Sequence, residues 1–427
     1  MMTPHDTVYQ YYLNLLKTEL KSCTGCTEPI AIALVSAKAK AVLSDMPDKV
    51  LCEVSRSVIK NAKSVVVPNT GGLKGIKAAI AAGVIAGNPE ASLGVIQTID
   101  PSKYPMIETY LKSTDIQVKT LETDYVLDIQ ITTYKGNHYA KVRLINHHDN
   151  IVLIEKNNDV LLIKDYIKET ETTLKQSAQS TVKGIVEFAD MCELSDVQDI
   201  IDLQIKNNQA IAQEGIDASY GANIGSVLLK AYGSDVINRA KAYAAAASDA
   251  RMSGSTLPVT IVSGSGNQGI TVSLPVIEYA KHLNSSKDRL TRALIISNLV
   301  TIHQKHHVGK LSAYCGAVFA GAGAGAGIAY LHGGDYEVIA HSIVNALAII
   351  SGMICDGAKP SCAAKIAAAV DAGILGYHMY LDGQQFYGGD GIVVKGIENT
   401  IINVARLATD GMKHTESEIV KMMTENQ

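Results

Sequence analysis

A block of β-favouring sequence interrupts a chain that is otherwise patterned for helices. Between residues 93 and 165, short runs rich in Val, Ile, Leu and Tyr alternate with Gly- and Asn-containing turns, a pattern typical of a small antiparallel module. The runs are 93–97, 116–119, 126–132, 139–144 and 151–154. The flanking regions carry helical, Ala-rich patterns. We therefore expect an α+β fold, in which residues 1–92 and 166–427 form a large, mainly α-helical domain and residues 93–165 form a small α+β module inserted into it.

The composition excludes several classes of protein. With 38 basic and 42 acidic side chains the net charge is −4, so the overall charge does not favour a nucleic-acid partner. The residues before Thr7 include an acid and no apolar core, so they do not resemble a signal peptide. Residues 311–330 are long enough to cross a bilayer, but they are mostly Gly and Ala and include Cys315 and Tyr314. We expect a buried helix–loop segment there, and no membrane partner.

Seven cysteines are dispersed along the chain, which does not suit a disulfide scaffold. We expect a reducing, cytoplasmic environment, and a homodimer is the default expectation for the assembly. Cys355 and Cys362 flank a loop that contains Gly357 and Pro360, and Cys315 lies beside a Gly/Ala-rich helical segment. Ser361 is a candidate N-cap, which places Cys362 at the start of the next helix. Each cysteine is otherwise explained as a small buried hydrophobic side chain.

Three thiolates can hold three irons of a four-iron cluster and leave the fourth iron open to a substrate. Four thiolates would close the cluster for electron transfer, and Cys26 is the fourth candidate. Cys26 precedes Thr27, Glu28 and Pro29 at a predicted helix start, where the helix dipole should lower its pKa. Cys23 and Cys26 form a Cys-x-x-Cys pair, but a helical segment precedes it and no second pair completes a zinc site. A single reactive thiolate at Cys26 is the preferred interpretation.

Two glycine-rich loops are candidates for binding an anion. The segment 264–269 follows a strand-like run, 259–263, and matches G-x-G-x-x-G, but no second strand with an acidic residue follows as a dinucleotide site requires. Backbone N–H groups at a helix start can instead hold a substrate carboxylate. The candidate substrate-binding residues are Ser265, Gly266, Asn267 and Gln268, with Asn69, Thr70 and Gly71 as an opposing wall. The alternative is two ordinary tight turns.

Two other features have ordinary explanations. His303, His306 and His307 invite a metal interpretation, but on a Lys-flanked stretch such residues are more often surface histidines. The alternating run Gly321–Gly327 indicates close backbone packing beside a bulky object, and a cluster would be one such object.

Several separate motifs together resemble the L-cysteine desulfidase family (the CyuA/UPF0597 group), which is related to the alpha part of iron–sulfur L-serine dehydratases. The motifs are Thr24-Gly-Cys-Thr-Glu-Pro29, Asn69-Thr-Gly-Gly-Leu-Lys-Gly75, Ser263-Gly-Ser-Gly-Asn-Gln-Gly269 and the triplet Cys315, Cys355 and Cys362. The resemblance covers nearly the whole chain. It implies an oxygen-sensitive 4Fe–4S cluster with three cysteine ligands, which map to that triplet, and one open iron.

The resemblance also implies that Cys26 takes part in catalysis and that the substrate is L-cysteine, which β-elimination converts to pyruvate, ammonia and hydrogen sulfide. Cys23, Cys52 and Cys192 match no role in the family. Two alternatives stay open from the residues alone. An iron–sulfur L-serine dehydratase would use the same scaffold, since an open iron binds a hydroxyl as readily as a thiol. A non-catalytic iron–sulfur sensor would need a partner surface, and no basic helix or tail suggests one.

Overall fold

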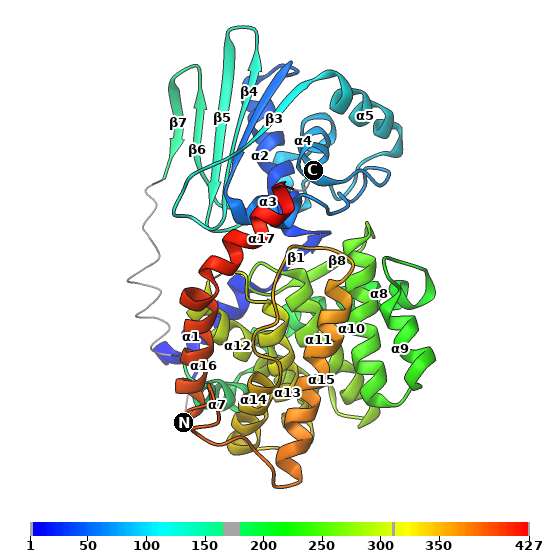
Figure 1. Ribbon diagram of the computed structural model, residues 1–427, viewed down its shortest axis with the longest axis vertical. Helices are drawn as coiled ribbons and strands as arrows, with labels where there is room; N and C mark the ends of the chain where they lie inside the picture. Colours follow the sequence, from blue (N-terminus) through cyan, green and yellow to red (C-terminus); the bar gives the residue numbers. More distant parts are fainter. Residues whose placement is uncertain (1–2, 165–179, 310–311, 426–427) are drawn as a thin grey trace.

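The computed structural model describes residues 3–164, 180–309 and 312–425, which form two stacked parts (Figure 1). The upper part in that view is a sheet with helices against it, and the lower part is a helical body. Helices predominate and the sheet is small, so the predicted α+β class is confirmed.

The helical body is assembled from both ends of the chain. Its helices are α1 (Thr7–Glu19), α7 (Val182–Met191), α8 (Gln198–Asp217), α9 (Ile224–Tyr232), α10 (Val236–Met252), α11 (Gly266–His282), α12 (Lys287–Val308), α13 (Gly316–Leu331), α14 (Tyr336–Ile350), α15 (Cys362–Leu381) and α16 (Ile397–Arg406). Short 3₁₀ segments at Leu194–Asp196 and a π-helical turn at Leu407–Gly411 complete it. Within the described ranges, none of the helices combines the length and the apolar character that a membrane span requires.

The Gly/Ala-rich helix α13 is the centre of this body and is almost entirely buried. It packs against α11, α12, α14 and α15. A Cβ atom at Gly321 would overlap the carbonyl oxygen of Ala369 on α15, and one at Gly323 would overlap Thr301 on α12. The bulky objects beside the Gly/Ala run are therefore neighbouring helices, and the expected buried helix–loop segment is confirmed for its described residues, 312–330.

The upper part contains a six-stranded sheet in the order β3-β2-β4-β5-β6-β7. The strands are β2 (Lys49–Val54), β3 (Asp115–Thr120), β4 (Asp128–Lys135), β5 (His138–Ile145), β6 (Ile151–Lys156) and β7 (Asp159–Ile163). Strand β2 runs parallel to β3 and antiparallel to β4, with Val50 opposite Ile116 on one side and Thr133 on the other. The other pairs are antiparallel. The helical elements of this part are α2 (Thr27–Leu43), α3 (Arg56–Ala62), α4 (Gly75–Ala86), α5 (Tyr104–Ser113) and the 3₁₀ segments η1 (Pro89–Gly94) and η2 (Pro101–Lys103).

The sheet corrects the predicted module in two respects. It is mixed, because the chain between β2 and β3 passes through α3, α4 and α5 and returns parallel to its start. It also takes β2 from before residue 93, so the elements that pack together extend outside the predicted 93–165 segment. The run 93–97 is not a strand, because Asn88 caps a 3₁₀ turn with Pro89 at its first position. The division of the chain into two domains stays a prediction.

A short two-stranded ribbon connects the two parts. Strand β1 (Lys21–Thr24) pairs antiparallel with β8 (Pro258–Ile261), so that Thr24 lies opposite Pro258. Helix α2 begins just after β1, while β8 turns at residues 262–265 into α11. The hydroxyl of Thr27 donates to the carbonyl oxygen of Gly264 at 2.9 Å. The ribbon thus brings the start of α2 beside the start of α11, two segments that are more than 200 residues apart in the sequence.

Candidate functional site

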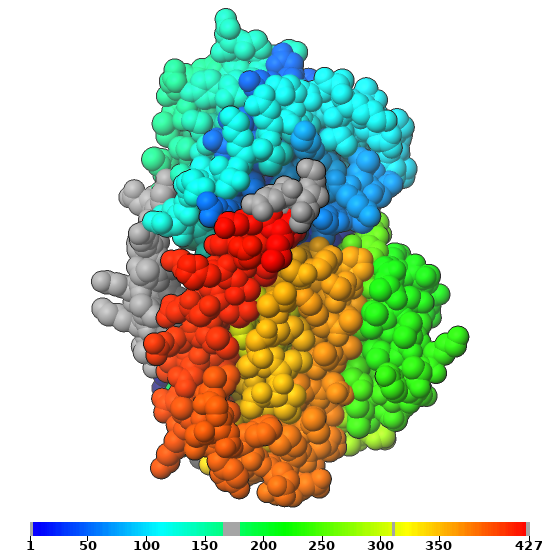
Figure 2. Space-filling view, viewed as in Figure 1, coloured from blue at the N-terminus to red at the C-terminus, as the bar shows by residue number. Residues whose placement is uncertain are grey.

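One pocket of about 810 Å³, its open mouth included, lies where the two parts meet. Its size is in the range of small-molecule sites. It brings together seven of the predicted site residues: Cys26, Ser265, Asn267, Gln268, Cys315, Cys355 and Cys362. On the face shown in Figure 2, the C-terminal helix α17 (Lys413–Glu425) lies across the junction between the upper and lower parts.

The other four predicted residues do not line this pocket. Asn69 donates its amide to the carbonyl oxygens of Ile96 and Gln97, both at 3.0 Å, and the Thr70 hydroxyl donates to Val67 O at 2.7 Å. These bonds, with Gly71 at φ +72°, describe a tight turn within the upper part. Gly266 is the first residue of α11, and a Cβ there would overlap the Arg251 guanidinium. The start of α2, which lies beside the start of α11, lines the pocket instead.

One wall of the pocket carries Cys315, Cys355 and Cys362, which we call the three-cysteine wall. Cys315 is the N-cap of α13, and Cys362 is the first residue of α15. An antiparallel bridge between Tyr314 and Ile354 places Cys315 beside Cys355, with Cys355 N–H donating to Ala313 O at 2.6 Å. Three short segments far apart in sequence therefore converge on one wall. The predicted helix start at Cys362 is confirmed, although the Ser361 side chain makes no capping hydrogen bond.

Two thiols of this wall, those of Cys315 and Cys362, have raised pKa values. Burial and the neighbouring Cys355 raise the pKa of Cys315 to about 12, and burial also raises the pKa of Cys362. Two lysines line the same wall. Lys365 donates to Asp356 Oδ1 at 2.6 Å and to Ile354 O at 2.8 Å, and burial lowers the pKa of Lys305 to about 8. A metal centre here would replace the thiol protons, since the thiolate is the ligand.

The donor set fits a cluster better than a single ion. Within the described residues, no three His, Cys, Asp or Glu side chains are grouped closely enough for one metal ion. The three thiols instead line one wall of the pocket from separate segments. In an iron–sulfur cluster each cysteine binds a different iron, so the ligands surround the group without converging on a point.

Another side of the pocket contains Cys26, which is the N-cap of α2, and Glu28. The Cys26 thiol donates to Glu28 Oε2 at 3.0 Å, and the Thr27 hydroxyl donates to the same oxygen at 3.1 Å. Glu28 Oε1 accepts from the Asn61 amide at 3.2 Å and lies 3.9 Å from His148 Nε2, an ion-pair distance. We call these groups the Cys26–Glu28 wall.

The prediction of a lowered pKa for Cys26 is wrong. Burial, followed by the negative charge of Glu28, raises the pKa of Cys26 well above its usual value, and the attraction of Arg251 does not offset them. Burial also acts to raise the pKa of Glu28, but attraction to His148 and the hydrogen bond from Cys26 outweigh it and lower that pKa to about 2. The pair therefore rests as a thiol beside a carboxylate. The helix dipole changes the pKa of a thiol less than burial and an adjacent charge do.

The start of α11 forms a third side of the pocket. The Ser265 hydroxyl accepts from Gln268 N–H at 3.4 Å, and the Arg251 guanidinium donates through Nη1 to Asn267 Oδ1 at 3.0 Å. Within the part of the chain that the structure describes, three buried atoms here have no hydrogen-bond partner: Arg251 Nε, Ser263 Oγ and Gln268 Oε1. Buried polar groups are almost always satisfied, so these atoms mark a surface that a ligand could complete.

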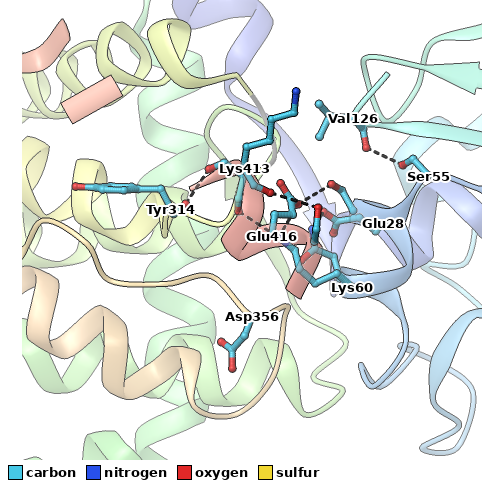
Figure 3. A network of polar contacts seen from close by, with 12 residues as sticks. Glu28, Ser55, Lys60, Val126, Tyr314, Asp356, Lys413 and Glu416 are labelled. Atoms are coloured by element: carbon cyan, nitrogen blue, oxygen red, sulfur yellow. Dashed lines mark hydrogen bonds and ion pairs between the residues drawn. The ribbon is translucent and has the colours of Figure 1, made fainter. Parts of the chain in front are cut away.

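Helix α17 fastens the upper part over the three-cysteine wall. The fully buried Lys60 ammonium on α3 donates to Glu416 Oε1 at 3.0 Å and to Ser312 O at 3.2 Å (Figure 3). Ser57 Oγ also donates to Glu416 Oε1, at 2.8 Å. Gly357, two residues after Cys355, has φ +94° and lies so close to the Lys60 carbonyl that a Cβ would overlap it. We call the Lys60–Glu416 pair the α17 clasp.

The remaining cysteines and histidines lie elsewhere. Cys23 and Cys52 are buried on β1 and β2, where burial raises the pKa of each to about 12, and Cys192 is buried near Tyr9. His303 is buried and contacts Glu398 at 2.7 Å, so a surface position for it is wrong. His306 and His307 are partly buried on the same helix and do not line the pocket.

The predicted site residues did not include the charged residues and the histidine that line the pocket: Glu28, His148, Arg251, Lys305 and Lys365. A signal existed for Glu28, which is part of the Gly-Cys-Thr-Glu-Pro motif. His148 comes from the loop between β5 and β6, so the β-rich region contributes directly to the site. Arg251 and Lys305 lie in helical patterns with no local feature that distinguishes them from surface cations.

Comparisons with known proteins agree along the chain. Residues 105–421 match the family described as serine dehydratase alpha chain. A UPF0597 protein of Desulfitobacterium hafniense is 56% identical over 422 residues, covering 99% of this chain and 98% of that protein. UPF0597 proteins of Lachnoclostridium phytofermentans and Treponema denticola are 49% and 42% identical, covering 97% and 99% of this chain and 100% and 99% of their own lengths.

Proposed function

Because this chain belongs to the serine dehydratase alpha chain family, we propose that it is an iron–sulfur-dependent lyase that eliminates hydrogen sulfide from L-cysteine. One observation carries the proposal. A single pocket has three cysteines on one wall and a thiol–carboxylate pair on the other. The first wall can hold a Lewis-acidic cluster, and the second can exchange a proton with a small substrate between them.

The proposed cluster ligands are Cys315, Cys355 and Cys362. A four-iron cluster bound by three cysteines supplies an open iron, a Lewis acid that makes the β-sulfur of the substrate a better leaving group. Lys365 and Lys305 line the same wall and add positive charge near three thiolates. That charge favours the deprotonated form of the ligands, as the lowering effect of Lys365 on the pKa of Cys315 indicates.

Cys26 is the proposed base for the α proton, and Glu28 is its partner. The thiol must first lose its own proton, and the acceptor within hydrogen-bonding distance is Glu28 Oε2. At rest this transfer is unfavourable, because the pKa of Glu28 is about 2 and that of Cys26 is raised. A substrate ammonium group near Cys26 would favour the thiolate. The base is therefore formed when the substrate binds, which protects an otherwise reactive thiolate in the empty pocket.

The overall reaction balances with these groups. Cys26 removes the Cα proton, the Cα electron pair forms the Cα–Cβ double bond, and the Cβ–sulfur bond breaks to release sulfide. The aminoacrylate product tautomerises to an imine, and water hydrolyses it to pyruvate and ammonia. The start of α11, with Ser265, Asn267 and Gln268, is the proposed site for the substrate carboxylate.

L-Serine dehydration is the second candidate, and the name of the matching family, serine dehydratase alpha chain, favours it. The same walls would serve, with a hydroxyl in place of the thiol. The two reactions share pyruvate and ammonia and differ in sulfide, so the products distinguish them.

The experiment is a parallel assay of anaerobically purified protein with L-cysteine and L-serine, with iron determined on the same sample. We expect sulfide and pyruvate in equal amounts from cysteine, and loss of that activity after exposure to air. Iron-loaded protein that is active on serine alone would replace the proposal with serine dehydration. Iron-loaded protein inert on both substrates would contradict a lyase and favour a sensor.

A further inference from the structure

We propose that Arg251 anchors the α-carboxylate of the substrate, which makes the free α-amino acid the class of molecule that this pocket accepts. The proposal rests on the proposed function, in that the pocket is taken to bind an amino acid. It adds a residue that no motif in the chain marks, and it assigns one end of the substrate to one place in the pocket.

The first argument is an uncompensated charge. Arg251 is 2% exposed and lines the pocket, yet among the described residues no carboxylate forms an ion pair with it. A buried guanidinium keeps its charge, because its pKa is too high for it to be neutralised. A buried charge without a counter-ion is strongly unfavourable, so an arginine in this position is best explained by an anionic ligand.

The second argument is the way in which Arg251 is held. Its Nη1 donates to Asn267 Oδ1 at 3.0 Å, and the Ser248 hydroxyl contacts the same oxygen at 3.2 Å. Two donors on Oδ1 fix the orientation of the amide, so Asn267 Nδ2 is the atom left to donate to a ligand. The guanidinium also rests against Gly266 at the first turn of α11, where any side chain would displace it. Arg251 is thus positioned in advance of binding.

The third argument is the set of unsatisfied atoms around it. Among the described residues, nothing hydrogen-bonds to the Nε of Arg251 or to the buried hydroxyl of Ser263, which lines the same pocket, and both groups can donate to an anion. Helix α11 has 17 residues, and its N-terminus adds N–H donors with partial positive charge. A carboxylate would satisfy the guanidinium and the helix start together, through charge-assisted hydrogen bonds.

This position gives the substrate a direction. The Gln268 amide lies beside Gly316, the residue after Cys315, because a Cβ at Gly316 would lie 2.8 Å from the Gln268 amide carbon. With the carboxylate at Arg251, the β-sulfur can extend toward Cys315 while Cα faces the Cys26–Glu28 wall. A compound with the thiol and the amine but no carboxylate would lack the contact that sets this direction.

The test compares two thiol ligands that each lack one group of cysteine. Anaerobically purified Arg251→Met would be titrated by calorimetry with 3-mercaptopropionate, which keeps the carboxylate, and with cysteamine, which keeps the amine. We expect the affinity for 3-mercaptopropionate to fall by roughly 10²-fold or more, as for a buried charge pair that loses one partner. Cysteamine binding should change by less than about threefold. Equal effects on the two ligands, or none on either, would overturn the proposal.

Arg239→Met is the matched control, since Arg239 lies on the same helix but bonds Glu278 and Ser234 outside the pocket. It should leave both affinities unchanged. Arg251→Lys should recover part of the carboxylate binding, which a purely structural role would not predict. If Arg251→Met does not fold, Asn267→Ala provides the same comparison with a smaller expected effect of about tenfold.

Ligand binding and turnover, measured separately, distinguish failure of the Arg251 anchor from failure of the proposed lyase function. Wild-type protein that binds 3-mercaptopropionate through Arg251 but releases no product from cysteine or serine would contradict the lyase and keep the anchor. Active wild-type protein whose Arg251→Met variant raises KM less than about threefold would contradict the anchor and keep the lyase. If Arg251 instead acts by stabilising the Cys26 thiolate, kcat would fall and its pH profile would shift while KM stayed constant, which also overturns the anchor.

Discussion

The two walls of the pocket use the same local device in different electrostatic surroundings. Cys26, Cys315 and Cys362 all lie at the N-terminus of a helix. Beside Cys26 there is a carboxylate, whereas the three-cysteine wall has Lys365 and Lys305. The first wall is therefore arranged to move a proton, and the second to hold an electron-rich group. The helix dipole and the burial are common to both, so the neighbouring charges make the difference.

The largest expected effect comes from removing a thiol of the three-cysteine wall. Cys355→Ala should lose the cluster, so iron content and lyase activity should both fall to background. Iron analysis and the ultraviolet–visible spectrum of anaerobic protein measure this. Cys192→Ala, a buried thiol outside the pocket, is the control and should keep its iron. Full iron content in Cys355→Ala would contradict the ligand assignment.

Removing the Cys26 thiol should separate proton transfer from cluster binding. Cys26→Ser should keep the iron and lower kcat by about 10²- to 10⁴-fold, the range for loss of a general base. Comparing iron content with turnover on one preparation tests it. Normal turnover would show that Cys26 is not the base, and loss of iron would move Cys26 to the cluster ligands.

Removing the negative charge of Glu28 tests whether neighbouring charges make the two walls differ. The negative charge of Glu28 helps to raise the pKa of Cys26, so Glu28→Gln should lower that pKa and make the thiolate form at lower pH. The rate of alkylation of the Cys26 peptide against pH, followed by mass spectrometry, measures the shift. Turnover should fall about 10- to 10²-fold, because the proton acceptor is lost. An unchanged or higher alkylation midpoint would contradict the role of Glu28.

The smallest expected effect concerns the α17 clasp, which holds the walls together. Glu416→Gln removes the charge that faces the buried Lys60, and we expect it to lower the free energy of unfolding by about 1–3 kcal/mol. Because Lys60 also contacts the loop carrying Cys355, iron should be lost faster on dilution into chelator. Urea unfolding and iron release measure the two effects. Glu418→Gln, which removes an exposed partner of Lys421 on the same helix, should change neither.

Local patterns predicted much of the scaffold. The helix starts near Pro29 and at Cys362 were predicted to within a few residues, and so were most strands of the sheet. Strands β2 and β7 were missed, although the alternation of polar and apolar residues in Lys-Val-Leu-Cys-Glu-Val of β2 is typical of a half-buried strand. The apolar residues of the run 93–97 predict a strand. Asn88 and Pro89, just before it, start a 3₁₀ turn instead, and this local signal decides the structure.

The sequence by itself determined the helical and β-rich regions, the loops that carry the cysteines, and the resemblance that connects them. Only the tertiary structure decided which of these residues share a pocket and in what charge state. The β1–β8 ribbon places α2 beside α11, and the clasp places α3 on the loop after Cys355. Contacts of this kind arise between segments hundreds of residues apart. A pKa is set by burial and by charges within a few ångströms, and no local pattern contains either. For that reason Cys26 is a thiol, and Arg251 belongs to the site.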